Sequence, residues 1–170
     1  MTVGRSDSGV ETDDIQEPAG WEDPITGLDG PDLWRRVLVA EVARSARYKR
    51  PLTVVAIELQ GLDIVSAAWG NEVARHTLRE AAQGILRTSR SSDYCARIGP
   101  SRIGVVLTET DEIAAINFVE RVREHAPKKL PRGAESLQLG FGWASPKAGE
   151  SAEALVRRAE TRLMVELLES

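Results

Sequence analysis

Two apolar runs separated by a Gly-Pro pair are the feature that most constrains how this chain folds. Residues 94–98 and 103–107 each have the length and composition of a strand, and Gly99, Pro100 and Ser101 lie between them. Glycine tolerates a tight reversal and proline fixes one backbone angle, so the pattern predicts a β-hairpin. We expect its tip at residues 99–102 and its two strands paired in a sheet.

The remaining pattern predicts the order helix, strand, helix, hairpin, helix, strand, helix. Helical spacing of apolar residues marks residues 31–48, 71–88, 111–125 and 151–167, while the continuous apolar run 52–59 is typical of a strand buried on both faces. Residues 137–143 alternate between large apolar side chains and Gly or Gln, which predicts a half-buried strand. Strands separated by helices favour an α/β fold with a mixed sheet covered by helices.

Composition narrows the class of protein. The 170 residues suit one domain, which we place at 21–170 after a polar, mobile tail at 1–20. The net charge of −4 disfavours broad binding to nucleic acid, and no apolar run approaches the roughly 20 residues of a membrane span. The single cysteine, Cys95, excludes an intrachain disulfide. We therefore expect a cytoplasmic protein that binds neither nucleic acid nor membrane.

Two motifs carry a resemblance to a known family. Arg90 and Asp93 form an RxxD pair shortly before the hairpin, and the sequence WEDPITGLDG at 21–30 is similar to the DxLTGL stretch that opens GGDEF (diguanylate cyclase) domains. The order of elements agrees with that family over about residues 23–167. The resemblance implies a GGDEF-like, nucleotidyl cyclase-type fold with a mixed, mainly antiparallel central sheet flanked by helices.

The same resemblance predicts that this domain is degenerate and is not an enzyme. The family signature lies at the hairpin tip, where this chain has Gly99, Pro100, Ser101, Arg102 and Ile103. An arginine in place of the signature glutamate changes the local charge by about two units, and Pro100 has no N–H to offer a phosphate. We therefore expect no catalytic residues, no metal and no cofactor at a former active site made of Glu58, Ser66, Arg75, Gly99, Pro100, Ser101 and Arg102.

The RxxD pair leads to a positive prediction. In the family this motif is the inhibitory site for cyclic di-GMP, so the resemblance implies that Arg90 and Asp93 bind this ligand, helped by Arg121 and Arg44. Arg90 can bond the O6/N7 edge of guanine in a bidentate way, and Asp93 can accept from the base. The predicted function is a catalytically inactive cyclic di-GMP receptor, and the expected partners are a second copy in a homodimer or another protein. The alternative is a protein-interaction module without a nucleotide ligand, and residual GTP binding is a weaker third reading.

Overall fold

The computed structural model describes residues 15–125 and 137–170, and it contains a four-stranded antiparallel sheet in the order β2-β3-β1-β4. The strands are β1 (Leu52–Gln60), β2 (Tyr94–Arg97), β3 (Arg102–Thr108) and β4 (Gln138–Ala144). The helices are α1 (Pro31–Tyr48), α2 (Leu62–Trp69), α3 (Asn71–Thr88), α4 (Glu112–His125) and α5 (Ala152–Glu169). The predicted α/β class with a mainly antiparallel sheet is confirmed, and the hairpin forms as expected, with Arg97 opposite Ile103.

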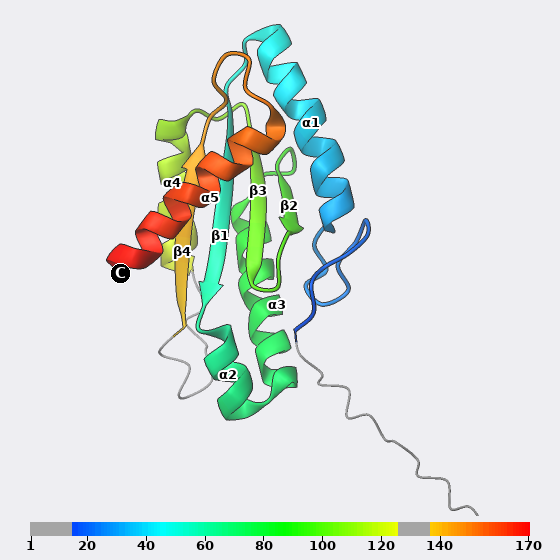
Figure 1. Cartoon of the computed structure of the whole chain (residues 1–170), viewed down its shortest axis with the longest axis vertical. Helices are drawn as coiled ribbons and strands as arrows, with labels where there is room; N and C mark the ends of the chain where they lie inside the picture. The colour runs from blue at the N-terminus through cyan, green and yellow to red at the C-terminus, as the bar shows by residue number, and fades with distance from the viewer. Residues whose placement is uncertain (1–14, 126–136) are drawn as a thin grey trace, which may run out of the picture.

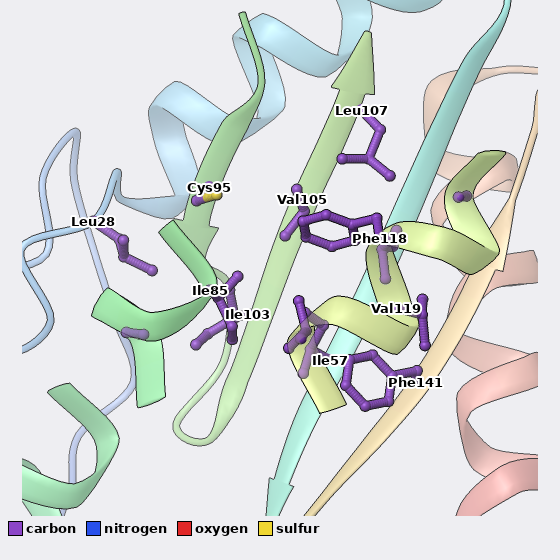
Figure 2. Packing of buried hydrophobic residues seen from close by; sticks show 14 residues of the cluster. Leu28, Ile57, Ile85, Cys95, Ile103, Val105, Leu107, Phe118, Val119 and Phe141 are labelled. Atoms are coloured by element: carbon purple, nitrogen blue, oxygen red, sulfur yellow. The ribbon is translucent and has the colours of Figure 1, made fainter. Parts of the chain in front are cut away.

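Helices cover both faces of the sheet (Figure 1). On one face, α1 and α5 pack over alternate strand residues such as Val54, Ala56 and Val106. On the other face, α3 and α4 pack over Val55, Val105 and their neighbours, and Figure 2 shows Phe118 and Phe141 among the side chains that fill this layer. Because successive side chains of a strand point to opposite faces, the continuous apolar run of β1 supplies both cores.

One helix was not expected from the sequence. Residues 62–69 form the separate short helix α2, which lies beyond the end of the sheet and packs through Leu62 and Val65 against α3. Gly70 lies between α2 and α3 and has φ 94°, which is not a helical value and therefore ends α2. Glycine adopts this backbone conformation readily. The apolar spacing of 62–69 merges with that of the following helix, so the break depends on this one residue.

Strand β4 is buried more evenly than its alternation suggested. Phe141 faces the α4 side, but Gly140 and Gly142 on the opposite side are also buried, because α5 packs directly on them. A Cβ at Gly142 would lie 2.1 Å from the Ala159 carbonyl oxygen and 2.3 Å from the Leu163 nitrogen. The glycines therefore mark close helix packing and not a solvent-exposed face.

Two stretches of the chain that were expected to lack regular structure fall wholly or partly outside the described residues. The mobile tail predicted at 1–20 lies outside the described residues over 1–14, and the basic stretch 128–135, which contains Pro and Gly and reads as a loop, lies outside them as well. Within the described part of the chain, no helix is long and apolar enough to cross a membrane. Helix α4 buries Ala115, Phe118, Val119 and Val122, whereas Ile113 and Ile116 are 77% and 43% exposed.

A buried ion pair attaches the segment before α1 to the hairpin tip. The Arg97 guanidinium lies 3.1 Å from an Asp23 carboxylate oxygen, and the two side chains are only 1% and 2% exposed. Arg97 also donates to the carbonyl oxygens of Pro100 and Gln16, while Asp23 accepts from the N–H and the hydroxyl of Thr26. Every charge in this cluster is hydrogen-bonded, which is the condition for burying an ion pair at a tolerable cost.

Exchanging Asp23 for Asn should lower the free energy of unfolding by about 3–5 kcal/mol, because the Arg97 charge would stay buried without its counter-ion. Urea denaturation measures this loss. Asp32→Asn is the matched control, since Asp32 pairs with Arg35 at exposed positions and its loss should cost at most about 1 kcal/mol. Equal small losses in the two variants would contradict a stabilising role for the buried pair.

A second ion pair fixes the turn that leads into α5. Arg158 donates through Nε and Nη2 to the two Glu150 oxygens, each at 2.7 Å, and the Lys147 N–H donates to the same carboxylate at 3.2 Å. These bonds, first of all those from Arg158, lower the pKa of Glu150 from 4.5 to about 2. The stabilisation is therefore complete above pH 4.5 and is lost as the pH falls from 4.5 towards 2.

The melting temperature should accordingly fall less in Glu150→Gln than in the wild type when the pH is lowered from about 6 to about 3, because the variant has no such carboxylate to protonate. Differential scanning calorimetry at the two pH values checks this. Glu153→Gln is the control, because it removes an exposed carboxylate in the first turn of the same helix. Its melting temperature should fall by the same amount as that of the wild type. An equal fall in melting temperature in the wild type and in Glu150→Gln would show that the Glu150–Arg158 pair contributes nothing to the pH dependence of stability.

Candidate functional site

The hairpin tip carries an ion-pair network that links it to β1 and α5. Arg102 Nε lies 2.8 Å from a Glu58 oxygen, directly across the β1–β3 pairing, and its Nη1 lies 3.3 Å from a Glu160 oxygen on α5. The Ser101 hydroxyl donates to the other Glu58 oxygen. The carboxylate of β1 is therefore neutralised and held by two residues of the tip itself.

A cavity of about 560 Å³ opens beside this network. It is lined by residues from the end of β1, the start of α2 and the tip, among them Glu58, Asp63, Ser66, Pro100 and Ser101. Ser66 donates to the Asn71 side chain, and Arg75 lies half-buried on α3. The structure thus gathers Glu58, Ser66, Pro100 and Ser101 at one cavity, while Arg75 is not among its lining residues.

The donor set at the tip does not suit Mg²⁺ ions. Such ions need several hard oxygen ligands, above all carboxylates. Here both Glu58 oxygens already accept from Ser101 and Arg102, and Gln60 offers only an amide. Within residues 15–125 and 137–170, no group of three or more His, Cys, Asp or Glu side chains could hold a metal ion.

Asp93 of the RxxD pair has a structural role that the sequence did not reveal. One carboxylate oxygen accepts from the Arg90 backbone N–H at 2.9 Å, and the other accepts from the Thr108 N–H at 3.2 Å. Asp93 thus ties the turn after α3 to the end of β3, and the Arg90 side chain is exposed beside it. Because an ionised carboxylate has about four lone-pair positions, each oxygen can still accept one further bond from a ligand.

A second cavity, which we call the RxxD cavity, lies next to this turn. It has a volume of about 200 Å³ and includes Ser92 and Tyr94, the residues on either side of Asp93. The end of α1 and the following turn add Arg44 and Arg50, and the remaining lining residues are Glu41, Ser45, Pro51, Leu52, Thr108 and Glu109. The structure therefore brings the predicted residue Arg44 to the same place as the RxxD turn.

Arg121 lies elsewhere. It is exposed on α4, which packs on the opposite face of the sheet from α1 and Arg44. Helix α4 packs beside α3, the helix that leads to Arg90, so Arg121 belongs to the α3–α4 side of the motif. The four predicted ligand residues thus divide into Arg44 on one face of the sheet, Arg121 on the other, and Arg90 with Asp93 in the turn before the edge strand β2.

The RxxD cavity and the hairpin tip lie at opposite ends of the sheet. Leu52 pairs with Thr108 at the RxxD end, whereas Glu58 pairs with Arg102 at the tip end. Six residues of strand separate the two positions, which corresponds to about 20 Å. The two candidate sites are therefore distinct, and paired strands β1 and β3 connect them.

Three ion pairs of the structure were not predicted from the sequence. Arg97 could have been suspected, because an arginine within a buried apolar strand needs a counter-ion, and Asp23 is that partner. The Arg102–Glu58 pair follows from strand register, which the sequence does not fix. The Arg50–Glu109 contact, at 3.3 Å, joins residues that are 59 positions apart, and nothing in the local pattern indicates it.

Comparison with known families and curated proteins gives a consistent result. The family model described as "Diguanylate cyclase, GGDEF domain" matches residues 21–167. Diguanylate cyclase DosC of Escherichia coli is 28% identical over 139 residues, which are 79% of this chain and 29% of that protein. Diguanylate cyclase DgcP of Pseudomonas aeruginosa is 25% identical over 144 residues, or 83% of this chain and 22% of that protein. The chain thus spans less than a third of the length of these relatives.

Solved structures show the same fold. The diguanylate cyclase SiaD of Pseudomonas aeruginosa, in complex with its activator SiaC, matches 90% of this chain and 60% of its own with a TM-score of 0.82 and 25% identity. The GGDEF domain of DgcB from Caulobacter crescentus, in complex with c-di-GMP, matches 89% of this chain and 92% of its own with a TM-score of 0.83 and 17% identity. At that identity the second likeness supports the fold alone.

These comparisons correct one prediction and confirm another. The expectation that the chain is not an enzyme is contradicted, because both the matching family and the curated relatives carry the name diguanylate cyclase. The expected family, in contrast, is confirmed by a model that matches residues 21–167, by the sequence relatives and by the fold. The chain belongs to the GGDEF domain family.

Proposed function

We propose that this chain binds cyclic di-GMP at the RxxD turn and the cavity beside it, and that this binding is how it takes part in signalling. The observation that carries the proposal is the RxxD cavity itself. Its wall is formed by the residues on both sides of Asp93 and by two arginines from another part of the chain. The motif therefore lies next to a concave site with two arginines in its wall, which a chance surface pair would lack.

The chemistry of the ligand suits these residues. Cyclic di-GMP presents two guanine bases and two phosphodiester groups, each phosphodiester with one negative charge. An arginine fork fits either the O6/N7 edge of guanine or a phosphate, and Arg90 is exposed and available for one of these. Asp93, with a free lone pair on each oxygen, can accept from the N–H groups of the same base.

The size of the cavity indicates how the ligand would sit. Sites that enclose a whole small molecule usually measure about 300–1,000 Å³. The RxxD cavity measures about 200 Å³, so we expect one base or one phosphate to enter it while the rest lies across the Arg90 turn. Arg44 would then meet the ligand from the α1 side and Arg121 from the α4 side.

A second candidate function is pairing with a protein partner, either a second copy or a different signalling protein. It is supported by the likeness to SiaD, a diguanylate cyclase whose structure was solved in complex with its activator SiaC. In this reading Arg90 and Asp93 act only in the fold, as the hydrogen bonds of Asp93 allow. The two candidates differ in whether the isolated chain binds the nucleotide.

Isothermal titration calorimetry of the purified chain with cyclic di-GMP should show saturable binding, and Arg90→Ala should weaken it by about tenfold or more, the loss expected for one charge-assisted contact. Arg44→Ala should weaken binding as well. Arg87→Ala is the matched control, because Arg87 is exposed in the last turn of α3, just before the motif, and should leave the dissociation constant unchanged.

Two results would count against the proposal. Binding that survives Arg90→Ala unchanged would place the nucleotide elsewhere on the molecule. No binding by the wild type, together with a stoichiometric complex formed with a protein partner, would favour the second candidate. A parallel titration with GTP tests whether the 560 Å³ cavity at the tip takes a nucleotide independently.

A further inference from the structure

The RxxD cavity contains as many carboxylates as guanidinium groups. Arg50 Nη1 lies 3.3 Å from both oxygens of Glu109, and Arg44 Nη1 lies 3.8 Å from an oxygen of Glu41. All four residues line the cavity, so its formal side-chain charge is zero. An anion that enters must therefore compete with carboxylates that already hold the arginines.

Arg50 is positioned for such a competition. Its backbone N–H donates to the Ser45 carbonyl at 3.1 Å, and its own carbonyl accepts from the Ser45 hydroxyl at 2.6 Å. Pro51 follows at once and limits the backbone further. The main chain at Arg50 is thus fixed against α1, while the side chain, 59% exposed, remains free to change its partner.

Glu109 is connected directly to the RxxD motif. It follows Thr108, whose N–H donates to Asp93 and whose hydroxyl donates to the Ser92 carbonyl. Its backbone has φ 52°, a conformation that residues other than glycine rarely adopt, and the Thr110 hydroxyl bonds back to the Thr108 carbonyl within this turn. The strained turn holds the Glu109 carboxylate over the cavity, one residue from the contact that Asp93 makes.

The Arg50–Glu109 pair contributes little to folding. Both side chains are about half exposed, at 59% and 48%, and ion pairs in such positions add little to stability because water and salt screen them. Breaking this pair costs little free energy. A phosphate oxygen is an equally good acceptor for a guanidinium group, so Arg50 is suited to exchange the Glu109 carboxylate for a phosphate that enters the cavity.

We propose that Arg50 is a further ligand residue, which binds a phosphate of the cyclic dinucleotide, and that Glu109 competes for it and so sets the affinity. This inference rests on the proposed function and adds to it two residues that the RxxD pattern does not contain. Ligand binding releases Glu109 from Arg50, so the affinity depends on the strength of that internal pair.

Calorimetric titration of four proteins tests the competition: the wild type, Glu109→Gln, Arg50→Gln and the double variant. Glu109→Gln should tighten cyclic di-GMP binding by about three- to tenfold, because Arg50 is then free, and Arg50→Gln should weaken it by about tenfold. In the Arg50→Gln background, Glu109→Gln should change the affinity by less than about twofold, since its target is gone. Glu80→Gln, which removes one exposed carboxylate from α3, is the control and should leave the affinity unchanged.

The outcomes separate this inference from the proposed function. No binding by the wild type overturns both. Loss of binding in Arg90→Ala with unchanged affinity in Arg50→Gln and Glu109→Gln overturns only the inference. Equal tightening by Glu109→Gln with and without Arg50 would show a general charge effect and would also overturn it. Melting temperatures of all variants should match that of the wild type, because the pair lies at the surface.

Discussion

The buried charge of Arg97 is the constraint on which the arrangement of this domain depends. A guanidinium group that is 1% exposed must have all its donors satisfied, and here they are satisfied by Asp23, by Gln16 and by the Pro100 carbonyl at the hairpin tip. The segment before α1 is thereby fixed to β2 and to the tip. Removing Asp23 would leave the Arg97 charge in the interior without a counter-ion, so this pair is central to the attachment of the three segments.

Strands β1 and β3 then place two chemically different sites at their two ends. At the tip, Arg102 neutralises Glu58 and extends to Glu160, which makes that end a closed ionic network. At the other end, the bonds of Asp93 shape a turn beside a cavity whose arginines are paired with carboxylates. The tip network is half-buried and joins four side chains, whereas the Arg50–Glu109 pair of the RxxD cavity is about half exposed and joins only two.

Local patterns were sufficient for most of the fold. The Gly-Pro reversal and the continuous apolar run of β1 are each determined by neighbouring residues, and both appear as predicted. The structural features that local patterns did not predict depend on contacts between distant segments of the chain. Helix α4 buries Ala115, Phe118, Val119 and Val122 but leaves Ile113 and Ile116 exposed, because the position of the sheet decides which side of the helix faces the core.

The candidate sites also combine features that neighbouring residues determine with features that depend on distant contacts. Arg90 and Asp93 were recognisable from their spacing, but the bonds of Asp93 to the backbone and the approach of Arg50 to Glu109 depend on strand register and on turn geometry. Arg44 and Arg121 were predicted as one ligand set, and the structure assigns them to opposite faces of the sheet. A sequence motif indicates which residues matter, whereas only the fold indicates what each of them faces.

A crystal structure of this chain grown with cyclic di-GMP tests the central claim most directly. The account predicts the dinucleotide against Arg90 and Asp93, with one base or phosphate inside the RxxD cavity and the Arg50 side chain turned from Glu109 to the ligand. A dinucleotide bound away from this turn, or crystals with the turn empty at saturating ligand, would contradict it.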